Sequence, residues 1–276
     1  MSNTLLVFDI DGTLINTNTS YLTAIKLTAE YFIKNSITDT NVEDIKMLSG
    51  FNNDWLAAYA LINSKLTKLP AETFSNEICK EEKKDFETIK KVFQNFYLGN
   101  KRFTEEYDTN PIVDMEKGLW ESETLIFSNE QLNELYKTFG PLKIITGRTA
   151  AEAEYSIKHF QIDKFFDQII SVEDITNKSL SKHPELNKHG KDKQNPVLLH
   201  KISNIGNFGL IYYIGDGISD MQLPFNARPE INIQGIHLLE SFKKDLRIDL
   251  MNNAAPYKPY KTLATAKEVF DFLLKD

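Results

Sequence analysis

The chain has 276 residues, of which 41% are hydrophobic and 26% charged, and its formal net charge is −7. These values are typical of a globular protein with a sizeable core. The negative net charge argues against binding to the phosphate backbone of nucleic acid. The single cysteine excludes an intrachain disulfide and fits a reducing compartment. No apolar run approaches the length of a membrane span, and the amino-terminus lacks the pattern of a secretory signal. We therefore expect a cytoplasmic protein that binds neither nucleic acid nor membrane, as a monomer or a weak homodimer.

The first predicted element is a buried strand over 4–8, because Thr-Leu-Leu-Val-Phe is a continuous run of β-branched, aliphatic and aromatic residues. Apolar residues over about 20–119 recur at helical spacing, which predicts a helical insertion. The polar segment 177–195 is expected to be a solvated loop. Further strands are predicted at 142–145, 168–172 and 210–214, with a weaker one at 230–233, and helices at 150–159, 196–205 and 264–274. Strands that alternate with helices predict an α/β fold with a doubly wound parallel sheet.

Two carboxylates, Asp9 and Asp11, directly follow the first predicted strand and precede Gly12. In open α/β sheets ligands bind beyond the carboxyl ends of the strands. An acidic pair at that place is costly unless a metal or a positively charged group offsets it. The simpler alternative is a turn, since Asp-Gly is a common turn dipeptide.

The second strand of the predicted sheet ends in Thr146, Gly147 and Arg148. A hydroxyl and backbone amides at a strand end can donate hydrogen bonds to a phosphoryl oxygen. Arg148 could contact a second anionic group of a substrate, or pair with a neighbour on the surface. Taken alone, the same residues suit an ordinary strand terminus.

Charged residues also flank the fourth predicted strand. Lys193 lies three residues before Pro196, which suits the first position of a helix, so its ammonium could reach a phosphate; Lys191 is a rival for this role. Asp216 and Asp220 follow the strand and supply oxygen ligands of the kind that Mg²⁺ prefers. Asp220 alone could instead cap a helix.

In order and spacing these motifs resemble the haloacid dehalogenase-like hydrolase superfamily with a type-1 helical cap, as in phosphoglycolate phosphatases and β-phosphoglucomutases. The resemblance implies a core of 1–18 and 120–276 and a cap of 19–119. Asn16 stands where relatives often carry aspartate. Its cap is similar to that of a subfamily with a Gly-Phe-Asn-Asn-Asp-Trp stretch, here 50–55. The residues that carry the resemblance are Asp9-Ile10-Asp11-Gly12-Thr13-Leu14, Thr146, Lys193 with Pro196, Gly215-Asp216 and Asp220.

The resemblance also implies roles for these residues. Asp9 would be the nucleophile that forms an aspartyl-phosphate, and Asp11 the general acid and then the general base. Thr146, Gly147 and Lys193 would hold the phosphoryl oxygens.

A Mg²⁺ ion would be held by Asp9, the backbone carbonyl of Asp11 and Asp216. Asp220 would be either a further ligand or a support for the others. The expected function is Mg²⁺-dependent hydrolysis of a small phosphorylated metabolite. A phosphomutase and a non-catalytic binding module are the alternatives.

The cap segment Gly50 to Trp55 is the candidate substrate-selecting loop. Phe51, Asn52 and Asn53 could contact the leaving group, since asparagine amides bind hydroxyls. The segment equally suits the start of a helix, with Asn53 as its cap.

Overall fold

The computed structural model describes residues 3–48, 51, 53–74, 84–175, 181–182, 193–242, 244 and 246–275. The chain divides into two compact units, an α/β unit of Met1–Asn16 with Thr124–Asp276 and a helical unit of Thr17–Glu123. Most of the predicted loop over 177–195, with Lys191, lies outside the described residues, as does Asn52. Within the described ranges, no helix is both long and apolar enough to span a bilayer.

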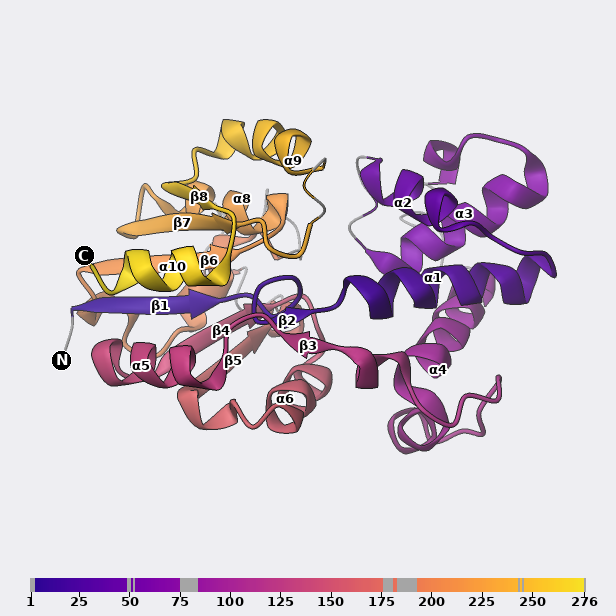
Figure 1. Cartoon of the computed structure of the whole chain (residues 1–276), viewed down its shortest axis with the longest axis horizontal. Helices are drawn as coiled ribbons and strands as arrows, with labels where there is room; N and C mark the ends of the chain where they lie inside the picture. The colour runs from indigo at the N-terminus through magenta and orange to yellow at the C-terminus, as the bar shows by residue number, and fades with distance from the viewer. Residues whose placement is uncertain are drawn as a thin grey trace. The chain divides into compact units, whose positions relative to one another are not determined.

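The α/β unit is built on a six-stranded sheet in the order β5-β4-β1-β6-β7-β8, in which every neighbouring pair is parallel (Figure 1). This confirms the predicted fold class. The strands are β1 (Thr4–Phe8), β4 (Leu142–Thr146), β5 (Phe166–Ser171), β6 (Leu210–Gly215), β7 (Ile233–Leu238) and β8 (Lys261–Leu263).

Helices cover both faces of this sheet, and the side chains of β1 alternate between them. Leu6 and Phe8 belong to a core that includes residues of α5, α6 and α10, whereas Leu5 and Val7 pack with α8 and the 3₁₀ helix η6. Each face thus has its own apolar layer, as a doubly wound sheet requires. The helices are α5 (Asn129–Phe139), α6 (Ala150–His159), η6 (Pro196–Lys201), α8 (Ile218–Ala227), α9 (Arg247–Ala254) and α10 (Ala266–Leu273).

Two elements differ from their predicted positions. The strand expected at 230–233 begins only at Ile233 and runs to Leu238. Gly235 interrupts its apolar pattern because α8 packs close by, and an added Cβ would lie 3.0 Å from Pro224 Cγ. The helix expected at 196–205 is the shorter η6, which ends at Lys201. Elements α5, α8, α9 and β8 were not predicted, nor were two short strands at Ile15–Asn16 and Thr124–Leu125.

The helical unit contains no strand among its described residues, as predicted for the insertion. Its last residue, Glu123, ties the unit together, because its Oε1 accepts hydrogen bonds from Ser20 Oγ at 2.7 Å and Tyr97 OH at 3.0 Å. Its elements are α1 (Asn18–Ile33), α2 (Asp39–Met47), α3 (Asp54–Thr67), η1 (Ala71–Phe74), α4 (Lys84–Tyr107) and η2 (Leu119–Ser122).

A two-stranded ribbon lies where the chain leaves and re-enters the α/β unit. Strand β2 (Ile15–Asn16) pairs antiparallel with β3 (Thr124–Leu125). The residues before and after the inserted unit are therefore hydrogen-bonded neighbours.

Phe8 anchors the core at the end of β1. Its buried ring meets Phe127 and Phe166 edge-on, with centroids 5.5 and 6.2 Å away. We expect Phe8→Ala to lower the free energy of unfolding by about 3–5 kcal/mol in urea denaturation, because a large cavity forms where relaxation is restricted. Tyr136→Ala, at a side chain 37% exposed on α5, is the control and should cost under about 1.5 kcal/mol. Equal losses would contradict this assignment of the core.

Candidate active site

The segment after β1 folds into a compact turn that brings two distant parts of the chain together. The amides of Leu14 and Ile15 both donate to the carbonyl of Ile10, at 2.9 Å each. Gly12 has φ +68°, and an added Cβ there would lie 1.7 Å from Asp216 Oδ2. The glycine therefore lets the turn pass directly beside the Asp216 carboxylate.

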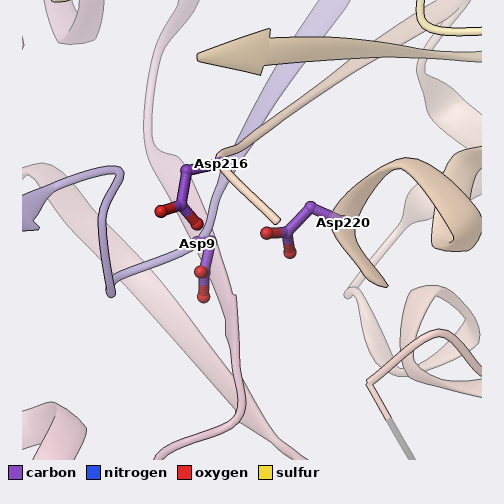
Figure 2. Close-up of side chains that lie close together, drawn as sticks. All are labelled: Asp9, Asp216 and Asp220. Carbon is purple, nitrogen blue, oxygen red and sulfur yellow. The ribbon is translucent and has the colours of Figure 1, made fainter. Parts of the chain in front are cut away.

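Three carboxylates converge at the carboxyl edge of the sheet. The amide of Asp9 donates to Ile214 O at 2.9 Å, so the residues that follow β1 and β6 lie next to each other. Ligand oxygens of Asp9, Asp216 and Asp220 lie within 4.8 Å of one another (Figure 2). Asp9 and Asp220 are only 2% and 1% exposed.

Lys193 bridges two members of this cluster. Its Nζ lies 2.7 Å from Asp9 Oδ2 and 2.6 Å from Asp220 Oδ1. Burial alone would lower the pKa of this ammonium, but the two ion pairs outweigh burial and raise the pKa above its usual value. The lysine therefore carries its charge at any physiological pH.

On the carboxyl groups of the cluster, burial acts in the opposite direction from its effect on Lys193, because it raises their pKa values. Burial raises the pKa of Asp9 well above its usual value; the ion pair with Lys193 opposes this shift, and the neighbouring carboxylates add to it. Burial, reinforced by Asp220, raises the pKa of Asp216 to about 7. One lysine thus does not neutralise three clustered carboxylates, two of which are buried, and the cluster favours a further positive charge.

Both oxygens of Asp220 already accept hydrogen bonds or ion pairs. Besides the ammonium of Lys193, Oδ1 accepts from Tyr213 OH at 3.0 Å, and Oδ2 accepts from the amide of Gly217 at 2.9 Å. Burial, followed by the charge of Asp220, raises the pKa of Tyr213, so the phenol stays protonated as a donor. Tyr213 was not predicted from the sequence, in which it is one of two tyrosines in an otherwise apolar predicted strand.

Two further residues that the sequence did not suggest hold Asp216. Ser241 Oγ donates to its Oδ2 at 3.0 Å, and His237 Nε2 donates to its backbone carbonyl at 2.8 Å. Burial lowers the pKa of His237, which favours the neutral ring. Both residues belong to β7 or the loop after it, so the neighbouring strand buttresses the Asp216 loop.

The cluster fits a hard divalent cation. Its donors are all carboxylate oxygens, and Asp9 Oδ1 is buried without a hydrogen-bond partner among the described residues. Mg²⁺ commonly binds through one or two carboxylates and keeps its remaining positions for water and substrate phosphate. The donor chemistry therefore suits Mg²⁺.

The end of β4 supplies Thr146 and Arg148. Thr146 is fully buried, its Oγ1 accepts from the amide of Arg148 at 3.2 Å, and Gly147 between them is exposed. Arg148 does not lie at the surface: its side chain is 1% exposed, and Nε and Nη2 lie 2.9 and 2.7 Å from Asp11 Oδ1. The structure thus joins Arg148 to the first carboxylate motif.

The candidate cap residues have local structural roles. Phe51 is fully buried, and Asn53 caps α3, its Oδ1 accepting from the amide of Leu56 at 3.0 Å. Lys46 Nζ donates to the Phe51 carbonyl at 3.1 Å. A substrate contact by Phe51, Asn52 or Asn53 stays a prediction.

The carboxylates that follow the central strands β1 and β6, together with a lysine from the segment before η6, meet at the carboxyl edge of a doubly wound sheet, which is the arrangement of an α/β enzyme. The family model of haloacid dehalogenase-like hydrolases matches residues 6–102 and 123–228. The chain belongs to this hydrolase family.

Solved structures of the same fold support the assignment. The phosphatase Tt82 of Thermococcus thioreducens is 27% identical with a TM-score of 0.62, and the match covers 89% of this chain and 98% of that one. A predicted phosphoglycolate phosphatase of Haemophilus somnus is 17% identical, with a TM-score of 0.58 and coverage of 100% and 98%. A haloacid dehalogenase-like family protein of Streptococcus pneumoniae is 16% identical, with a TM-score of 0.55 and coverage of 99% and 100%. No curated protein matches the chain at a significant level.

The pKa of Asp216 predicts how metal binding and stability depend on pH. Its usual value is 3.8 and its value in the fold is about 7. Between these values the folded protein holds a proton that the unfolded chain has lost, so this group makes the metal-free protein less stable as pH rises through that window.

We therefore expect Mg²⁺ to raise the melting temperature more at about pH 8 than at about pH 5.5, because it competes with this proton. Thermal unfolding in Mg²⁺ and in EDTA at both pH values measures the difference. Asp216→Asn should lose most of the Mg²⁺ effect at both. A Mg²⁺ effect that is equal at the two pH values in the unmodified protein would contradict the expectation.

Proposed function

We propose that this protein is a Mg²⁺-dependent phosphatase that hydrolyses a small phosphorylated metabolite through an aspartyl-phosphate on Asp9. The observation that carries the proposal is the state of the Asp9 carboxylate. It is buried, Lys193 holds its Oδ2, and its Oδ1 has no partner among the described residues. Membership of a hydrolase family and the likeness to a phosphatase at 27% identity support the same reaction.

In the first step the Asp9 carboxylate attacks phosphorus and forms a new oxygen–phosphorus bond. The bond from phosphorus to the substrate oxygen breaks, and Asp11 gives that oxygen its proton. In the second step Asp11, now a carboxylate, takes a proton from water while the water oxygen attacks phosphorus. The Asp9–phosphorus bond breaks, and inorganic phosphate leaves with both aspartates restored.

Charge on the transferring group spreads over its oxygens, so fixed donors stabilise the transition state. We assign this role to the Thr146 hydroxyl, the Gly147 amide and the Lys193 ammonium. Lys193 is suited to it because its raised pKa keeps it charged beside Asp9. Thr146 is suited because it is the last residue of β4, the strand next to β1.

The metal would be held by the carboxylates of Asp9 and Asp216 and by the backbone carbonyl of Asp11. When bound, Mg²⁺ offsets negative charge so that an anionic nucleophile can meet an anionic phosphate. Asp220 is better suited to holding Lys193 than to direct ligation, because both its oxygens already accept bonds from the protein.

The helical unit is the proposed source of substrate selectivity. It enters the chain directly after the turn that carries Asp9 and Asp11. Phe51, Asn52 and Asn53 remain the candidates within it; Asn53 Oδ1 caps α3, so a hydroxyl of the substrate would be bound through its Nδ2 donors.

The test is phosphate release from p-nitrophenyl phosphate. We expect turnover with Mg²⁺, loss of turnover with EDTA, and a drop of about a thousandfold or more in Asp9→Asn, since an amide cannot form the phosphoenzyme. Asp249→Asn, which removes an exposed carboxylate on α9, is the matched control and should keep wild-type activity. Full activity in Asp9→Asn would overturn the nucleophile assignment. No release from this ester or from a panel of phosphorylated metabolites would overturn the phosphatase.

A further inference from the structure

Arg148 has no role in the reaction steps above, yet its guanidinium is paired with Asp11, which transfers the proton in both of them. The two residues are 137 positions apart, at the ends of neighbouring strands β4 and β1. Both Nε and Nη2 of the guanidinium donate to the same oxygen, Asp11 Oδ1. The pair is therefore a specific contact between two strand-end loops of one sheet.

The guanidinium is also held from its other side. Nη1 donates to Ser156 Oγ on α6, and Ser156 Oγ donates to the Glu152 carbonyl at 2.8 Å. The start of α6 is itself fixed by a capping box, in which Thr149 Oγ1 accepts from the Glu152 amide at 3.2 Å. Because its anchor is a helix of the core, Arg148 is a fixed support.

The two partners differ in solvent exposure, as expected if Arg148 positions the carboxylate and Asp11 reacts with the substrate. The Arg148 side chain is 1% exposed, whereas the Asp11 side chain is 30% exposed. Arg148 is thus enclosed by protein, and Asp11 is the partner that solvent or a ligand can reach. This ordering disfavours Arg148 as the group that meets an anionic substrate.

We propose that Arg148 is a positioning residue for the acid–base carboxylate of Asp11. Two N–H groups on Oδ1 fix the rotation of the carboxylate and leave Oδ2 as the oxygen that carries and returns the proton. An exposed aspartate in a turn otherwise samples several rotamers, and misplacing a catalytic group by about 1 Å can cost about a hundredfold in rate. This inference rests on the proposed function.

A substrate-binding arginine and a positioning arginine predict different kinetics. Loss of positioning weakens proton transfer, so it matters most when the leaving oxygen needs a proton. Phenolate is a much poorer leaving group than p-nitrophenolate, while the two phenyl phosphates are similar in shape. The pair of esters therefore isolates the contribution of the acid.

We expect Arg148→Met to lower kcat/KM about a hundredfold for phenyl phosphate and only about tenfold for p-nitrophenyl phosphate. Hydrolysis of the phosphoenzyme should also slow, because it needs Asp11 as a base, so p-nitrophenolate should appear in a burst of one equivalent per enzyme. Inhibition by inorganic phosphate should change less than about threefold. Arg148→Lys should recover part of the loss, and Ser156→Ala should show the same ester preference at about a fivefold loss.

Arg228→Met is the control, since the Arg228 guanidinium bonds to the Lys258 carbonyl away from these residues and should leave both esters unaffected. Equal losses on the two esters, together with weaker inhibition by phosphate, would overturn the inference and make Arg148 a phosphate-binding residue.

A double-mutant cycle on thermal unfolding separates this inference from the proposed function. With the contact present, Arg148→Met should lower the melting temperature less in the Asp11→Asn background than in wild type. If the wild type hydrolyses neither ester, the proposed function is wrong, and the catalytic part of the inference with it. If hydrolysis is intact and the cycle shows no coupling, only the positioning role is wrong.

Discussion

The site depends on holding three carboxylates together, two of them almost fully buried and Asp216 partly buried. Asp9, Asp216 and Asp220 have ligand oxygens within 4.8 Å of one another, and burial raises the pKa of the first two. A buried group of like charges is costly unless opposite charge and hydrogen bonds accompany it. Lys193 supplies part of that compensation through its contacts with Asp9 and Asp220. The negative charge that Lys193 leaves uncompensated favours the binding of a metal cation at this place.

The remaining polar residues of the site keep these carboxylates in place. Tyr213 and the Gly217 amide fix Asp220, and Ser241 with His237 fixes the Asp216 loop. Each contact comes from a strand or turn of the parallel sheet, whose own cores lie on its two faces. Because these hydrogen bonds come from a rigid sheet, they restrict the movement of the charged groups and help to preorganise them for a charged transition state.

Residues with an unusual type at a strand end could be predicted from the sequence, and residues that support them could not. Asp9 and Asp216 stood out because charge at the carboxyl edge of a buried strand has few structural explanations, whereas Lys193 was one lysine among several in a polar loop and could be singled out only by its distance from Pro196. Tyr213 looked like another core aromatic, because its hydroxyl partner is visible only once β6 and α8 are packed. Arg148 was assigned outward, toward a substrate or the surface, since nothing in the sequence reveals a contact with Asp11 across 137 positions.

The ribbon of β2 and β3 bears on how such a chain can change over evolutionary time. Asn16 pairs with Thr124, so the helical unit leaves and returns through two adjacent points of the backbone. Loop-closure entropy grows only slowly with length, and here the ends are already joined by hydrogen bonds, so an insert of another size costs the α/β unit little. With the selectivity role proposed above for the helical unit, a new leaving-group preference can arise by exchanging or enlarging the insert, while the residues of the α/β unit stay unchanged.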